Sequence, residues 1–275
     1  MLSRVELDLR KFVVNYVNDY ILVNQKIQET KYRKPVIGFS DANNPLFRKL
    51  KEVVTSSHYL PQDLLADVST VISVFLPFSE SVVKSNYDKE ITSKEWAVAY
   101  TETNELLDKL TYALADEFKK LGYHALGIKT THHLAHAKKD SYSYDELFSN
   151  WSQRHVAFIS GIGTFGLNNL LITVRGCAGR IGSLLTSAKI DLTKRDSEEG
   201  CLVKRGIYCY KCVERCPVNV ISKDGKFDRV GCMDYLVRMR KYQESVYKLK
   251  EGTQTCGKCD SNIPCDIKIP KKRVD

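Results

Sequence analysis

The chain has 275 residues, with 42 Lys and Arg against 33 Asp and Glu and a formal net charge of +9. This length accommodates one large domain with a well-filled core and a small appended domain. The N-terminus is charged within its first residues, and no run reaches the roughly 18 apolar residues of a membrane span, so we expect a cytoplasmic protein with neither a signal peptide nor a membrane partner.

The first part of the chain predicts alternating helices and strands. Apolar residues recur at three- and four-residue steps over residues 2–27, which predicts an amphipathic helix. A short strand is expected over Pro35–Phe39, and Asn44-Pro45 starts a helix that reaches Val54. The β-branched and apolar run Val71–Leu76 predicts the most completely buried strand.

A long helix follows, from a cap at Ser93 to a stop at Gly122, and "HALGI" predicts the next strand. Strands that alternate with helices indicate an α/β body, in which helices cover a sheet. We place this body in residues 1–190 and a smaller domain in residues 191–275.

The segment after residue 150 combines a predicted helix, Trp151–Ile159, with the glycine-rich "GIGTFG". The glycines match G-x-G-x-x-G but follow a helix and precede a strand, the reverse of the dinucleotide-binding order, so we expect no Rossmann site. They instead permit a close backbone approach to a flat or bulky group. "LLITV" and "RIGSLLTSAKI" predict two strands, with Cys177 as an exposed free thiol beside the turn Gly176–Gly179.

Eight of the nine cysteines lie in the smaller domain, and none precedes Cys177. They are Cys201, Cys209, Cys212, Cys216, Cys232, Cys256, Cys259 and Cys265. The pattern contains C-x-x-C twice and C-x-x-x-C-P once. Eight thiolates match two 4Fe-4S clusters with four ligands each, which predicts a ferredoxin-like domain.

In two-cluster ferredoxins the cysteine before proline binds the other cluster. We therefore predict one cluster on Cys201, Cys209, Cys212 and Cys265, and the second on Cys216, Cys232, Cys256 and Cys259. Pro217 also predicts a short helix through Val218–Ile221. A zinc ribbon is the alternative, although zinc does not account for C-x-x-x-C-P, and disulfides would need an oxidising compartment.

The positive charge is smaller than the formal value if the clusters are present. Each oxidised cube with its four thiolates carries about −2, which brings the net charge to about +5. This excess permits an RNA or acidic protein partner and equally fits a solvated lysine-rich surface. The predicted basic helix Met233–Lys250 either presents Arg238, Arg240 and Lys241 to a partner or forms a solvated face.

The segment "WSQRHVAFISGIGTFGLNNLLIT", followed by the two cysteine sets, resembles the epoxyqueuosine reductase family, and the resemblance extends from "PVIGFSDANNPLF" to Cys265. It implies an N-terminal domain related to nitroreductase-like, cobalamin-binding folds, with a ferredoxin-like domain packed on it. It also implies that electrons pass from the clusters to a cobalamin that reduces epoxyqueuosine in tRNA. The residues implied to line the cobalamin are His155, Gly161, Gly163, Thr164, Phe165, Gly166 and Asn168.

The resemblance has three local departures. The position of the family's acid aspartate holds Leu147, so Asp145 and Glu146 are the nearest catalytic candidates. Thr164-Phe165 stands where full-length members typically carry Trp-Ile. The helical-repeat extension that helps those members hold tRNA does not follow Cys265.

Two classes of function follow. The first is a cobalamin-dependent iron–sulfur reductase that takes electrons from a donor such as ferredoxin or flavodoxin, with tRNA as a candidate substrate. The alternative is a ferredoxin-like electron carrier, or a reductive activator of a corrinoid protein, without turnover of its own. A structural iron–sulfur or RNA-binding protein is a third hypothesis, and none of the three includes DNA as a partner.

Overall fold

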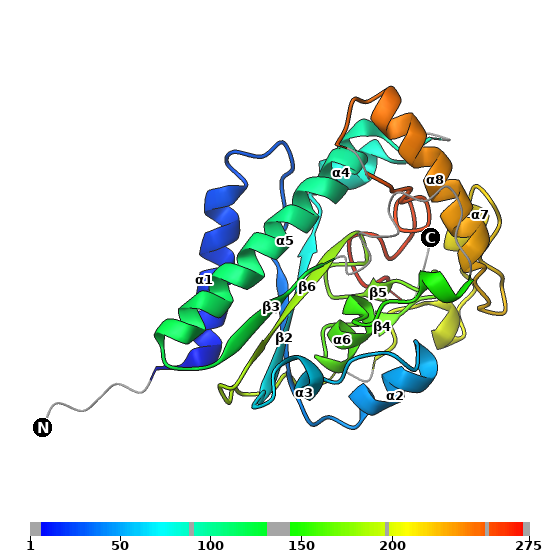
Figure 1. Cartoon of the computed structure of the whole chain (residues 1–275). Coiled ribbons are helices and arrows are strands. Elements are labelled where there is room, and N and C mark those ends of the chain that lie inside the picture. Colours follow the sequence, from blue (N-terminus) through cyan, green and yellow to red (C-terminus); the bar gives the residue numbers. More distant parts are fainter. Residues whose placement is uncertain (1–6, 88–90, 131–143, 196–197, 251–252, 272–275) are drawn as a thin grey trace, which may run out of the picture.

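The computed structural model describes residues 7–87, 91–130, 144–195, 198–250 and 253–271 (Figure 1). A four-stranded sheet lies at its centre, with α1 and α5 on one side and α2, α3 and α6 on the other. Within the described residues, no helix is both long enough and apolar enough to cross a membrane.

The sheet has the strand order β1-β2-β6-β3. Its strands are β1 (Val36–Asp41), β2 (Thr70–Pro77), β6 (Gly179–Thr186) and β3 (Ala125–Ile128). All neighbouring strands run antiparallel. Strand β2 is buried along its whole length, which confirms the prediction from its apolar run.

The connection from β2 to β3 runs through α4 (Glu80–Ser85) and α5 (Lys94–Lys120). Both strands are antiparallel to β6, so they run in the same direction with β6 between them. The predicted alternation of strands and helices is therefore present. However, β6, which comes later in the chain, lies between β2 and β3. The predicted ends of α5 are confirmed: Ser93 Oγ accepts from Trp96 N, and Gly122 has a left-handed φ of +89°.

Helices α1 (Leu9–Asn24) and α5 bury one face of the sheet. Helix α1 begins later than predicted because Asp8 caps it, accepting from Lys11 N at 2.9 Å. The apolar core on this face is Val13, Val17, Ile21, Phe39, Ile72, Val74, Leu76, Leu106, Leu107, Leu110, Leu114, Ala115, Phe118, Ala125, Leu184, Ala188 and Ile190.

The other face packs against α2 (Leu46–Val53), α3 (Pro61–Leu64) and α6 (Gln153–Ile159). Trp151 is buried here, and its Nε1 donates to Ser183 Oγ of β6 at 3.0 Å. This contact fixes the start of α6, and therefore the segment that leads into the glycine loop.

The remaining elements lie outside the four-stranded sheet and the helices that cover it. They are η1 (Tyr144–Leu147), β4 (Thr164–Phe165), β5 (Leu171–Ile172), η2 (Val203–Arg205), α7 (Lys211–Glu214) and α8 (Arg229–Ser245). The predicted helix Val218–Ile221 is wrong, because Asn219 adopts a left-handed φ of 54° and Ile221 forms a β-bridge with Phe227. Helix α8 also differs from the expectation in that Arg240 is buried and so is not presented to a partner.

Hydrogen bonds tie the cysteine-rich segment to the body. Ala178 N donates to Asp266 O at 3.0 Å, and Arg33 Nη1 donates to Ile267 O at 2.7 Å. The boundary between residues 190 and 191 stays a prediction, and these bonds join the parts on its two sides.

Candidate functional site

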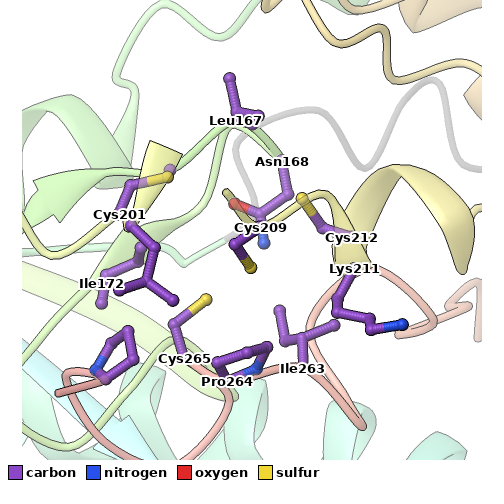
Figure 2. Close-up of a pocket in the computed structure, with 13 residues that line it drawn as sticks. Leu167, Asn168, Ile172, Cys201, Cys209, Lys211, Cys212, Ile263, Pro264 and Cys265 are labelled. Carbon is purple, nitrogen blue, oxygen red and sulfur yellow. The ribbon is translucent and has the colours of Figure 1, made fainter. Parts of the chain in front are cut away.

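Four cysteines surround one cavity at the junction of the glycine loop and the cysteine-rich segment. Figure 2 shows the side chains of Cys201, Cys209, Cys212 and Cys265 around this space. Its empty volume is about 320 Å³, part of it open to solvent. The other lining residues are Gly166, Leu167, Asn168, Ile172, Leu202, Lys211, Ile263, Pro264 and Pro270. These four are the cysteines that the sequence assigns to the first cluster.

The backbone holds these sulfurs from three separate segments. Gly200 N donates to Thr164 Oγ1 at 2.8 Å, which fixes the residue before Cys201 against β4. Cys212 lies in α7, and Cys209 lies just ahead of that helix. Cys265 O accepts from Cys177 N at 2.9 Å, which anchors the third segment to the body.

The other four cysteines form a second group. Cys216, Cys232 and Cys259 pack into one apolar cluster with Val220 and Ile221. Burial, together with the neighbouring Asp260 and Cys232, raises the pKa of Cys256 to about 12. The structure therefore brings together the second predicted ligand set as well.

Burial makes these thiols hard to ionise on their own. It raises the pKa of Cys212 to about 12 and that of Cys232 to about 11, with nearby thiols contributing in the same direction. A metal centre reverses this preference because its positive charge stabilises thiolates. Among the described residues, no three His, Cys, Asp or Glu side chains are grouped to hold a single metal ion. A cube differs from a single ion in taking each thiolate on a different iron atom.

Two buried asparagines brace the second C-x-x-C loop. Asn168 Nδ2 donates to Cys259 O at 2.7 Å. Asn86 Nδ2 donates to Cys256 O at 3.1 Å, and Asn86 Oδ1 accepts from Lys258 Nζ at 2.9 Å. The role of Asn86 could not be predicted from the sequence because, in "SNYDKE", it is indistinguishable from an ordinary turn residue.

The glycine loop packs against its own chain. A Cβ at Gly163 would lie 2.4 Å from Ile172 O, and one at Gly166 would lie 2.6 Å from Asn168 Oδ1. The space that these two glycines leave free of a side chain is therefore occupied, at least in part, by atoms of the β4–β5 hairpin. Gly161, whose φ is +78°, lies beside the segment that contains Thr193.

The two aromatic members of the predicted cobalamin set are neighbours. The ring of His155 lies 4.8 Å from that of Phe165, and its Nδ1 is 2.7 Å from Ser152 Oγ. Burial, together with the smaller effect of the nearby Arg154, lowers the pKa of His155 to about 4. His155 is therefore neutral at pH 7.

A cluster of charged groups lies beside the second cysteine set. Burial lowers the pKa of Arg154 to about 10, and its Nη1 donates to Asn169 O at 2.6 Å. Burial raises the pKa of Asp260 to about 7, against the opposing effect of Arg180. Asp260 Oδ1 and Gln254 Oε1 are buried and have no hydrogen-bond partner among the described residues. Such orphaned acceptors fit a bound group that carries hydrogen-bond donors.

The catalytic candidates lie in η1, and this element contacts α8. Glu146 is half-buried, whereas the side chain of Asp145 lies outside the described residues. Their catalytic role stays a prediction, as does the role of the predicted cobalamin-lining residues.

The prediction that Cys177 is exposed is wrong. Its side chain is only 4% exposed, because the chain after Gly176 pairs with the backbone at Cys265 and Asp266. The thiol therefore packs among Ile172, Cys201 and Ile263.

Comparisons with known proteins agree with the sequence resemblance. No family model matches the chain. Over 125 residues, or 44% of the chain, it is 29% identical to the epoxyqueuosine reductase of Staphylococcus aureus, and the match spans only 30% of that relative.

Solved structures extend the similarity to nearly the whole fold. The epoxyqueuosine reductase from Streptococcus thermophilus matches 94% of this chain and 69% of its own, with a TM-score of 0.52 and 18% identity. A catabolic reductive dehalogenase matches 86% of this chain and 30% of its own, with a TM-score of 0.57 and 15% identity. The chain is thus similar to epoxyqueuosine reductases in sequence over less than half of its length, and it shares their fold.

Proposed function

We propose that this chain is an iron–sulfur reductase that works with cobalamin, in the manner of epoxyqueuosine reductases. The observation that carries the proposal is the gathering of four cysteines around one cavity, with three more packed in a second cluster and Cys256 close to one of them, Cys232. The wider fold supports it, because structures of epoxyqueuosine reductases and reductive dehalogenases share this arrangement of elements.

The donor set fits two 4Fe-4S clusters. Cys201, Cys209, Cys212 and Cys265 would hold the first, and the remaining four of the C-terminal set would hold the second. When bound, the clusters and the cobalamin supply one-electron chemistry that the side chains alone lack. The protein contributes apolar walls such as Ile172 and Ile263, which limit access of water to the cluster.

The residues beside the second cysteine group fit a corrinoid. Its peripheral amides are hydrogen-bond donors, and Asp260 Oδ1 and Gln254 Oε1 are buried acceptors without partners among the described residues. His155 presents a neutral ring beside Phe165. A reductive dehalogenase of similar fold is described as B12-dependent, which supports the same assignment here.

We extend the proposal to epoxyqueuosine in tRNA as the substrate. One epoxyqueuosine reductase of similar fold was solved with an epoxyqueuosine-modified tRNA stem loop. The net positive charge of this chain is compatible with an RNA partner. An electron donor such as ferredoxin or flavodoxin would supply the reducing equivalents.

The test begins with anaerobic reconstitution of the protein with iron and sulfide, followed by addition of hydroxocobalamin. We expect about eight irons per chain, cobalamin that co-elutes with the protein, and reduction of epoxyqueuosine in a tRNA stem loop. About eight irons without retained cobalamin would favour the electron-carrier alternative. Zinc in place of iron would overturn the proposal.

A matched pair of variants separates the two clusters. Cys212→Ala removes a ligand of the first group and Cys232→Ala one of the second, so each variant is expected to lose about four of about eight irons. EPR spectra of the reduced variants should then each retain a different cluster signal. Identical residual spectra would contradict the assignment of the cysteines to two groups.

A further inference from the structure

The ninth cysteine lies against the first cluster site without belonging to either group of four. Cys177 is 4% exposed and shares an apolar cluster with Cys201, Cys212 and Cys265. It does not line the cavity around which the four cysteines gather. Its sulfur is therefore placed behind the ligand set and away from solvent.

Cys177 contacts one ligand in two ways. Its backbone N donates to Cys265 O at 2.9 Å, and its side chain packs in the same apolar cluster as the side chain of Cys265. The next residue continues the pairing, since Ala178 N donates to Asp266 O at 3.0 Å. Gly176 permits this approach, because a Cβ there would lie 2.2 Å from Asp266 O. The position of the thiol is thus fixed by the backbone.

The chemistry of the contact has a defined direction. An ionised Cys265 bound to iron has no proton and can only accept, whereas a cysteine thiol keeps its proton at neutral pH and can donate. Hydrogen bonds to cluster sulfurs are one of the factors that set the potentials of iron–sulfur clusters. Apolar neighbours such as Ile172 and Ile263 leave this thiol as a donor in a water-poor environment.

We propose that Cys177 is a positioning residue that raises the reduction potential of the cluster on Cys201, Cys209, Cys212 and Cys265 by donating an S–H hydrogen bond to the Cys265 sulfur. Reduction adds one electron, taken from dithionite in the test, and brings the charge of the cube with its thiolates from about −2 to about −3. A donor to the ligand sulfur stabilises the more negative state more strongly. The inference rests on the proposed function only in requiring that these four cysteines hold a cluster.

The test compares Cys177→Ala, which removes the donor, with Cys177→Ser, which keeps one. Iron content and an EPR-monitored dithionite titration are measured for both variants and for the wild-type protein. We expect about eight irons in all three. The potential of the first cluster should be most negative in Cys177→Ala and should return toward the wild-type value in Cys177→Ser. The second cluster serves as an internal reference with an unchanged potential.

The outcomes separate this inference from the proposed function. A wild-type protein that takes up no iron would overturn both. Normal iron content with equal potentials in the three proteins would overturn only the role of Cys177. Loss of about four irons in Cys177→Ala, together with full iron content in Cys265→Ala, would show instead that Cys177 is the ligand and would also overturn the inference.

Discussion

The sheet-and-helix body and the cysteine-rich segment are held together by different physical means. The body buries a continuous set of aliphatic and aromatic side chains between α1, α5 and the sheet. Among the described residues of 198–271, α8 is the one long helix. The two apolar clusters of this segment include cysteines. Apolar burial thus stabilises the body, whereas under the proposed function the segment would depend on the clusters that its cysteines hold.

The body and the segment also differ in what burial does to the side chains that it covers. Each fully buried leucine of the body contributes about 1.5–3 kcal/mol by leaving water. In the segment, burial disfavours ionisation of thiols such as Cys212 and Cys256. A bound cluster would turn that cost into a gain, because metal binding to thiolates contributes directly to folding.

The largest expected effect comes from removing iron. Anaerobic chelation should abolish hydrogen-exchange protection of amides over residues 198–271, while the amides of β2 and β6 stay protected. The physical reason is that the body keeps its apolar core, whereas the segment would lose the cross-links that the proposed clusters provide. Uniform loss of protection in both parts would contradict the comparison, and uniform retention would show that the segment folds without metal.

Much of the body could be predicted from the sequence, because its signals are local. The apolar run Val71–Leu76 marks β2, and the capping residue Ser93 marks the start of α5. The insertion of β6 between β2 and β3 could not be predicted, since no local pattern records which strands pair across more than 50 residues of intervening chain.

The candidate site also has features that the sequence predicts and features that it does not. Cysteine spacing predicted two ligand groups, and the structure brings the same four cysteines around one cavity. The burial of Cys177 and the bracing by Asn86 were missed because both depend on contacts with distant residues. The helix predicted after Pro217 failed because the turn at Asn219 and the bridge to Phe227 override the local preference of proline.

A truncation in the apolar core tests whether the body and the cysteine-rich segment are stabilised separately. Leu110 is fully buried between α5 and the sheet, so Leu110→Ala should destabilise the protein by about 2–5 kcal/mol through lost burial and the cavity left behind. Chemical denaturation followed by far-UV circular dichroism measures this loss. Iron content under native conditions should match that of the wild-type protein. A large loss of iron would mean that the two parts are not separately stabilised.

A variant at the contact between the two parts should have an intermediate effect. Asn86→Ala removes the donor to Cys256 O and an acceptor of buried Lys258, at a cost of about 3 kcal/mol for groups left partly unsatisfied. We expect faster loss of the second cluster during chelation, with the first cluster less affected. Asn24→Ala is a suitable control, because the side-chain amide of Asn24 donates within α1, to Tyr20 O. Equal rates of cluster loss in the two variants would contradict the bracing role.

The smallest predicted effect concerns pH and His155. Its pKa is lowered by burial to about 4, whereas an unfolded histidine titrates near 6.5. Between these values the unfolded chain binds more protons than the native one, so His155 should lower stability progressively as the pH falls below about 6.5. For a half-buried ring the full effect is about 1–2 kcal/mol.

The matched experiment compares the wild-type protein with His155→Gln, using denaturation midpoints from pH 7.5 to 5.5. The wild-type protein should lose more stability over this range, because glutamine keeps hydrogen-bonding capacity without titrating. His155 packs on Phe165, in the loop that also holds Asn168 against Cys259. A pH effect on the second cluster that disappears in His155→Gln would therefore show that this loop transmits the effect of His155 protonation to the cluster. An equal pH dependence in both proteins would exclude that route.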